Sequence, residues 1–211
     1  MIQERLKALR AEMEKRGITV YVVPTADFHE SEYVGDHFKA RKFITGFTGS
    51  AGTAVITLDE AGLWTDGRYF VQAENQLKDS TVTLYRMGEE GVPTVDEFVK
   101  DRLKEGGCLG FDGRVVNGTW GGKLEKIAAE KNVSMHVTED LIDLIWEDRP
   151  ALSKQPLFIL EEKYSGKSTA DKIGDLRKAM KENGADVPNN DPIIHCRGRK
   201  LPLIIQFSGR F

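Results

Sequence analysis

Apolar residues recur at two different spacings along the first 150 residues of the chain. Leu6, Leu9 and Met13 follow helical spacing and precede Gly17, a residue type common just beyond a helix C-terminus. The apolar run at residues 20–23 instead has the length of a buried strand. Strand and helix patterns then alternate as far as residue 146, and a capping box, T-x-x-E, occupies residues 94–97.

This alternation predicts an α/β fold with a mixed sheet flanked by helices. Further strands are expected at residues 51–57, 63–65, 81–87, 108–111 and 134–137. Further helices are expected at residues 70–77, from 94 to near 106, around 124–128 and at 141–146. A turn at residues 59–62 would make the early part of the sheet a hairpin, and the polar segment 25–41 is expected to be a long loop.

The pattern restarts after residue 156. Five residues repeat the first helix at one constant offset: Ile173, Leu176, Arg177, Met180 and Gly184 match Leu6, Leu9, Arg10, Met13 and Gly17. The match indicates either a duplication or chance, because any amphipathic helix that ends in glycine resembles another. We therefore expect a first domain at 1–150, a linker at 151–156, part of a second domain at 157–186 and an atypical tail at 187–211.

Composition narrows the function classes. Thirty Lys and Arg against 33 Asp and Glu leave a net charge of −3, which gives no reason to expect a nucleic-acid partner. No apolar run approaches the roughly 18 residues of a membrane span, and the charged N-terminus has no signal-peptide core. Two cysteines, Cys108 and Cys196, fit a reducing compartment, so a cytoplasmic location is expected.

Residues 165–169, with the sequence SGKST, are the first candidate for chemistry because they resemble part of a phosphate-binding loop. The complete motif needs a glycine where this chain has Glu161. The alternative is an ordinary helix N-terminus, with Ser168 or Thr169 as the cap and Asp171 in the first turn. The residues favour the alternative.

A metal site or a nucleophile has weaker support. Residues 27–37 hold metal-ligand side chains, but the zinc pattern H-E-x-x-H fails because Tyr33 stands at its last position. The alternative is a solvated loop in which Asp27 makes an Asx turn. Ser50 lacks the G-x-S-x-G spacing of a hydrolase nucleophile, and Cys108 falls in a predicted buried strand.

The glycines at 46, 49 and 52 recur every third residue, just before a predicted strand. Their exposed N–H groups could cradle an anion, or the glycines could simply allow a sharp turn. Arg68 could grip a carboxylate, or could form a surface ion pair with Asp66 or Glu74. The residue types alone favour a scaffold over a binding site.

Several longer blocks resemble one family. Residues 43–53 and 63–70, FITGFTGSAGT and LWTDGRYF, closely resemble the N-terminal domain of cytosolic Xaa-Pro aminopeptidases, which belong to the creatinase/prolidase, or pita-bread, metallopeptidase superfamily. Residues 27–33, 144–150 and 164–169 look like further blocks of that family. The resemblance runs from about residue 4 to about residue 186.

The resemblance implies a ribonuclease-H-like α/β domain with a second such domain after it, both preceding a catalytic domain. In the family, the N-terminal domains mediate dimerisation and shape access to the active site, and the catalytic domain uses two manganese ions to remove an N-terminal residue that precedes proline. That domain needs roughly 200 further residues, whereas about 60 follow the first domain here. We therefore expect no metal or other cofactor in this chain and no peptidase activity of the chain alone. The tail suggests a truncated or frameshifted reading frame.

The resemblance also supplies expectations for sites and partners. Candidates for a place near a substrate entrance or a partner's active site are Phe47, Gly49, Ser50, Asp66, Arg68, Tyr69 and His29. The implied partners are a second copy or a full-length homologue, and proline-containing peptides in the complete enzyme. Alternatively, the chain is a free-standing interaction module or binds small anions or peptides.

Overall fold

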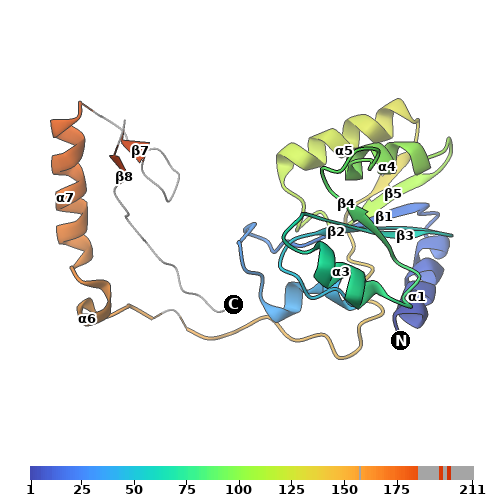
Figure 1. The fold of residues 1–211 in the computed structure, drawn as a ribbon, viewed down its shortest axis with the longest axis horizontal. Coiled ribbons are helices and arrows are strands. Elements are labelled where there is room, and N and C mark those ends of the chain that lie inside the picture. Colours follow the sequence, from blue (N-terminus) through green and yellow to red (C-terminus); the bar gives the residue numbers. More distant parts are fainter. Residues whose placement is uncertain (157, 185–194, 197–198, 201–211) are drawn as a thin grey trace. The chain divides into compact units, whose positions relative to one another are not determined.

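The computed structural model of the protein describes residues 1–156, 158–184, 195–196 and 199–200. The chain divides into two compact units, Met1–Leu152 and Ser153–Phe211 (Figure 1). The first unit contains a six-stranded sheet and most of the buried residues, and the second contains two helices and a short hairpin.

The sheet is mixed, as predicted. Its strands are β1 (Val20–Pro24), β2 (Thr53–Thr57), β3 (Ala61–Thr65), β4 (Thr83–Arg86), β5 (Cys108–Phe111) and β6 (Ser134–His136), in the order β4-β3-β2-β1-β5-β6. Strand β2 runs antiparallel to both of its neighbours, while β3 pairs with β4, β1 with β5 and β5 with β6 in parallel. The five strands other than β2 therefore all run in one direction.

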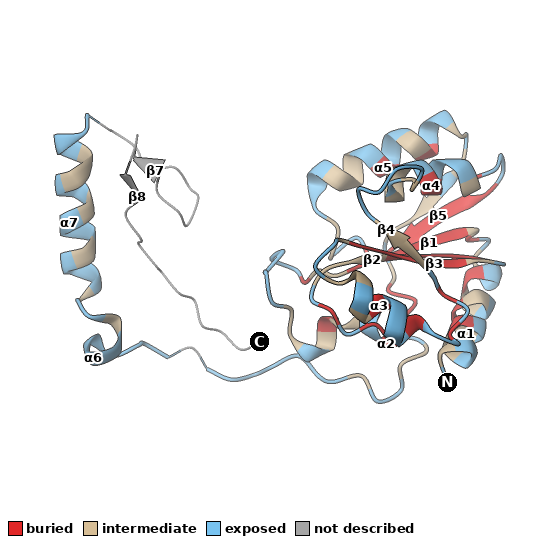
Figure 2. Cartoon of the chain, viewed as in Figure 1, coloured by how far each residue is buried: buried red, intermediate tan, exposed pale blue. Residues whose placement is uncertain are grey.

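Helices cover both faces of this sheet. Figure 1 shows α1 (Ile2–Lys15), α2 (Ala40–Thr45) and α3 (Phe70–Leu77) on one face and α4 (Val95–Arg102) and α5 (Gly118–Glu130) on the other. Strand side chains alternate between the two cores: Tyr21 and Val23 face the first group of helices, and Val20 and Val22 face the second. Because both faces are covered, all five residues of β1 are buried, and the inner strands β1, β2, β3 and β5 are largely red in Figure 2, whereas the edge strands β4 and β6 are not buried.

Local hydrogen bonds begin and end several of these elements, among them the predicted capping box. The capping box of α4 is complete, since Glu97 donates its N–H to Thr94 Oγ1 at 3.2 Å and its carboxylate accepts the Thr94 N–H at 2.8 Å. Asn117 caps α5 by accepting the N–H of Trp120 at 2.8 Å. The hairpin of β2 and β3 closes around Thr57, whose Oγ1 accepts the Glu60 N–H at 2.8 Å.

Other predicted boundaries were wrong. Segment 25–41 is not wholly a loop, because a 3-10 turn spans Asp36–Phe38 and α2 begins at Ala40. The predicted helix at 141–146 is instead a series of turns, in which the Trp146 N–H reaches Ile142 O at 3.0 Å. Asp140 accepts the Ile142 N–H at 3.0 Å, which favours a turn at the point where a helix would have to begin.

The second compact unit is Ser153–Phe211. It contains α6 (Glu162–Ser165), α7 (Thr169–Glu182) and a two-stranded antiparallel sheet of β7 (His195–Cys196) and β8 (Arg199–Lys200). Ser168 caps α7 by accepting the Asp171 N–H at 3.1 Å, so SGKST forms a helix N-terminus, as the residues favoured. None of the α7 residues is buried. Apart from β7 and β8, the predicted tail at 187–211 lies outside the described residues.

Candidate functional site

A groove lies at one edge of the six-stranded sheet. Since β1, β3, β4 and β5 run in the same direction, their carboxyl ends meet at this edge, together with the start of β2. Ligands of α/β proteins commonly bind in the crevice outside the carboxyl ends of the strands. The groove here has a volume of about 410 Å³, and its lining includes Thr25, Glu32, Ser50, Asp66, Met87 and Trp120.

The glycine-rich segment, residues 46–52, forms one wall of this groove. Ser50 is exposed and places its Oγ 2.6 Å from the Tyr69 Oη at the start of α3. The Phe47 ring is fully buried and lies edge-on to the Tyr69 ring, with 6.0 Å between centroids. The structure thus brings Phe47, Ser50 and Tyr69 into contact, although 19 residues separate Ser50 from Tyr69.

The glycines of this segment are required by space and by backbone conformation. A Cβ at Gly49 would stand 2.2 Å from the Phe47 ring, so a side chain there would displace the ring. Gly46 ends α2 with a left-handed φ of 80°, which glycine adopts without strain. These observations support a sharp turn in this segment over an anion cradle.

Asp66 and Arg68 form a bidentate pair just beyond β3. Arg68 donates from Nε to Asp66 Oδ1 at 2.8 Å and from Nη2 to Oδ2 at 2.9 Å. The side-chain bond to Arg68 lowers the pKa of Asp66 to about 2. Asp66, and not Glu74, is therefore the partner of Arg68, while Glu74 accepts from Arg86 at 3.3 Å.

The same arrangement recurs at the end of β5. The sequence D-G-R appears there again, and Arg114 donates to Asp112 from Nε at 2.9 Å and from Nη2 at 3.0 Å. Because two D-G-R turns after parallel strands adopt one geometry, the ion pair itself is a local turn feature. The Arg68 side chain stays 70% exposed despite this pair.

The loop at residues 27–33 forms the opposite wall. Asp27 Oδ1 accepts the N–H groups of His29 at 2.9 Å and Ser31 at 3.0 Å, which confirms the predicted Asx turn. Glu30 accepts from Asn117 Nδ2 at 2.5 Å and so joins this loop to the start of α5. His29 is exposed and is absent from the residues that line the groove, unlike Glu30, Ser31 and Glu32.

The metal ligands considered at residues 27–37 have structural partners. The Nδ1 atom of His37 lies 2.8 Å from Pro150 O, and Asp27 is occupied by its Asx turn. Across the described part of the chain, no three His, Cys, Asp or Glu residues cluster in a way that could hold a metal ion. The described residues at 27–37 therefore do not fit a metal centre.

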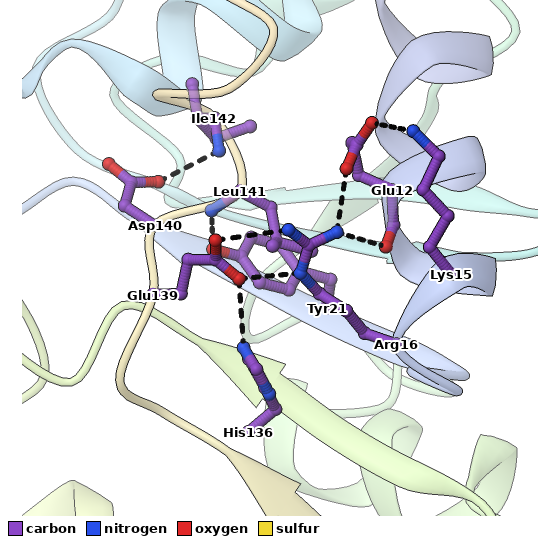
Figure 3. Close-up of polar contacts among 9 residues, drawn as sticks. All are labelled: Glu12, Lys15, Arg16, Tyr21, His136, Glu139, Asp140, Leu141 and Ile142. Atoms are coloured by element: carbon purple, nitrogen blue, oxygen red, sulfur yellow. Dashed lines mark hydrogen bonds and ion pairs between the residues drawn. The ribbon is translucent and has the colours of Figure 1, made fainter.

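A separate polar cluster holds the segment that follows β6 (Figure 3). Arg16 donates to Glu139 at 2.6 Å and to Glu12 at 2.7 Å, and His136 Nε2 lies 3.3 Å from Glu139. The buried Tyr21 hydroxyl accepts the Leu141 N–H at 2.9 Å, and burial raises the pKa of Tyr21. These contacts secure the returning chain against α1 and β1.

Sequence reasoning missed three groups that shape the groove. Thr25 and Asn117 supply hydrogen bonds at its walls, and Arg41 supports the glycine-rich segment from below. Little in the sequence indicates that Arg41 is buried, because a basic residue in a polar segment is usually exposed. In the structure it is 4% exposed.

Comparison with known proteins decides the family. The sequence model of the creatinase/prolidase N-terminal domain matches residues 5–145, about two thirds of the chain, and a second model with the same description matches residues 148–188. The chain belongs to the creatinase/prolidase N-terminal domain family. The resemblance inferred from the sequence blocks and the predicted fold class are both confirmed.

Named members of the family contain a similar sequence within longer proteins. A probable Xaa-Pro aminopeptidase P of Sordaria macrospora is 44% identical over 185 residues, which cover 86% of this chain and 30% of that protein. Aminopeptidase P2 of Arabidopsis thaliana is 39% identical over 87% of this chain and 26% of its own length. The chain thus spans less than a third of either relative.

A solved structure gives the same result. The X-prolyl aminopeptidase of Caenorhabditis elegans, described as a cytosolic enzyme with a di-nuclear active site, matches with a TM-score of 0.73 and 33% identity. The match covers 88% of this chain and 32% of that enzyme. Among the helices in the described ranges, none has the length and apolar character needed to cross a bilayer.

Proposed function

We propose that this chain is the non-catalytic N-terminal region of a Xaa-Pro aminopeptidase, where it takes part in assembly and shapes access to the active site. The observation that carries the proposal is the pair of family matches at residues 5–145 and 148–188, in proteins of which the chain spans less than a third. The complete enzyme would remove an N-terminal residue that precedes proline.

The catalytic metal would be bound outside these residues. The Caenorhabditis elegans relative is described as having a di-nuclear active site, and the family resemblance implies two manganese ions. The described residues hold no cluster that fits such a centre, so no step of peptide hydrolysis is assigned to them. The cytosolic description of that relative supports a cytoplasmic location for the complete enzyme.

Within this role, residues 46–52 and 66–69 are the surfaces proposed to face a substrate entrance or a partner subunit. Ser50 and Asp66 line the groove, and Tyr69 bonds to Ser50. The exposed guanidinium of Arg68 stands beside them, 5.2 Å from the centroid of the Tyr69 ring. The proposed partner is a second copy or a full-length homologue.

Peptide hydrolysis and association test the two halves of the proposal. The purified chain, supplied with manganese and a Xaa-Pro peptide, should show no turnover, since its described residues hold no cluster of carboxylates that fits a di-nuclear centre. In sedimentation velocity, the chain should self-associate or bind a full-length homologue. Turnover by the chain would refute the non-catalytic role, and a monomer that ignores the homologue would refute the role in assembly.

A pair of matched variants locates the contact. Arg68→Ala and Arg114→Ala remove the same D-G-R ion pair from the ends of β3 and β5. We expect Arg68→Ala to weaken association and Arg114→Ala to leave it unchanged. Equal effects of the two variants would count against the assignment to residues 66–69.

A further inference from the structure

Arg41 is a buried cation, and none of its hydrogen bonds among the described residues goes to a carboxylate. Its side chain lies in α2 and is 4% exposed. Nε donates to Thr25 Oγ1 at 2.9 Å, Nη1 to Phe47 O at 2.6 Å and Nη2 to Gly49 O. Within the described residues, the guanidinium therefore donates to one hydroxyl and two backbone carbonyl oxygens.

Such a charge needs compensation from its surroundings, because a buried ion without it is strongly unfavourable. The two carbonyl dipoles and the face of the Phe47 ring, whose centroid is 4.7 Å from Arg41 Cζ, provide it. Burial lowers the pKa of Arg41 to about 10, so the side chain is still charged at neutral pH. The arrangement therefore keeps a full positive charge beneath the glycine-rich segment.

These bonds determine which groups of residues 46–52 face inward. The carbonyls of Phe47 and Gly49 point to Arg41, and the Gly52 carbonyl accepts from Thr25 Oγ1 at 2.7 Å. The groups between them turn outward. The Thr48 N–H reaches Gln76 Oε1 at 2.9 Å, and the exposed Ser50 hydroxyl meets Tyr69 at 2.6 Å.

We propose that Arg41 is a positioning residue that sets the outward geometry of residues 46–52, the surface through which the chain meets a partner or a substrate entrance. The proposal rests on the function proposed above for that surface. Arg41 itself touches neither. Its planar guanidinium addresses three acceptors in fixed directions, which a lysine ammonium cannot reproduce.

If Arg41 only filled space in the core, its variants would behave differently. If Arg41 served merely as core volume, Arg41→Met would preserve the segment, because methionine replaces the stem and removes an unfavourable buried charge. If Arg41 positions the segment, Arg41→Met and Arg41→Lys should both loosen residues 46–52 even where global stability is kept. The positive charge of a lysine, without the planar guanidinium, would not hold the segment in place.

Arg5 supplies a matched control. It also donates to a backbone carbonyl, Phe43 O at 2.8 Å, and its Cζ lies 4.1 Å from the centroid of the Phe43 ring. Within the described ranges its hydrogen bond goes to Phe43, which lies outside residues 46–52. Arg5→Lys and Arg5→Met therefore remove a similar interaction from the same face of the sheet without touching the segment.

Hydrogen exchange on the full chain tests the proposal. Amides of residues 48–52 should exchange about tenfold faster or more in Arg41→Lys and Arg41→Met than in the parent and the Arg5 variants, while amides of α5 should be unchanged. Thr25→Val removes the acceptor of Nε and the hydroxyl donor to Gly52 O but keeps the backbone N–H that also donates to Gly52 O at 3.0 Å, so it should accelerate the same amides more mildly. Unchanged exchange of residues 48–52 in Arg41→Lys and Thr25→Val would overturn the proposal, and would do so even if Arg41→Met failed to fold.

Association in the same variants separates this inference from the proposed function. Arg41→Lys should weaken binding to a full-length homologue by about tenfold, whereas Arg5→Lys should bind as the parent does. Faster exchange with unchanged association would overturn the positioning role in assembly. A parent chain that does not associate at all would refute the proposed assembly function instead, and the exchange result would still decide whether Arg41 orders the segment.

Discussion

Asp140 and Arg149 form the most buried ion pair of the described residues, and its removal gives a quantitative prediction. Their side chains are 5% and 8% exposed, and Arg149 Nη1 donates to Asp140 Oδ2 at 2.6 Å. Arg149 also donates from Nε to His37 O at 2.9 Å, and Asp140 accepts the Ile142 N–H. The pair therefore ties the two ends of the returning segment, residues 140–149, together, and the bond to His37 attaches the segment to the domain.

Breaking such a pair costs more than the pair contributes, because the remaining partner stays buried and unpaired. Removal of one partner of a buried pair typically lowers the free energy of unfolding by about 3–5 kcal/mol. Asp143 accepts from Arg149 at 3.1 Å and is 63% exposed, so it compensates part of the charge in Asp140→Asn. We therefore expect a loss of about 3 kcal/mol for Asp140→Asn and at least as much for Arg149→Met.

The double variant decides whether the two effects are coupled. The double variant Asp140→Asn with Arg149→Met should lose about 2 kcal/mol less free energy of unfolding than the sum of the two single variants. Each single variant leaves one buried charge without its partner, whereas the double variant leaves none. Urea unfolding followed by tryptophan fluorescence measures this, since Trp146 stacks on Phe43 with 4.5 Å between ring centroids. With a urea m-value of about 2 kcal/mol/M, the midpoint of Asp140→Asn should fall by about 1.5 M.

Arg16 and Glu139 provide the control pair. They approach to 2.6 Å but are 22% and 37% exposed, so their coupling in an equivalent cycle should stay below about 1 kcal/mol. Additive losses at Asp140 and Arg149, or a coupling no larger than that of the control, would refute the reasoning that burial governs the strength of these pairs.

Two further predictions concern the sheet and the groove. Gly62→Ala should destabilise the chain by about 1–3 kcal/mol, because the new Cβ would stand 2.6 Å from the Trp64 ring and 2.7 Å from the Tyr85 ring. Thermal unfolding measures this loss, and Gly122→Ala is the control because a Cβ at Gly122 would have no neighbour within 4 Å. In a carboxyl NMR titration, Asp66 should show a pKa of about 2 that returns toward its ordinary value in Arg68→Ala. Because folding lowers the pKa of Asp66, the ion pair stabilises the chain above about pH 4 and loses that contribution as the pH falls toward 2. The effect on the free energy of unfolding should be small, since both side chains are accessible to solvent.

Local hydrogen bonding made several features predictable from the sequence. The capping box at Thr94, the Asx turn at Asp27 and the start of α7 at Ser168 each depend on bonds that span four residues or fewer. Alternating strand and helix patterns were enough for an α/β fold with a mixed sheet, and the sequence blocks were enough for the family. Boundaries drifted where a side chain offered the backbone another partner, as Asp140 does at the predicted helix 141–146.

The groove and its support depend on contacts between distant segments. Glu30 meets Asn117 across 87 positions, and Ser50 meets Tyr69 only because β2 and β3 pair in register. Arg41 looked like an exposed basic residue, yet the fold buries it under carbonyls six and eight positions later. Most elements and the family could be predicted, since they follow from short-range bonds and residue patterns, whereas α2 and the turns at 141–146 could not. Which side chains meet at the sheet edge depends on strand order and burial, and these arise only when distant segments pack together.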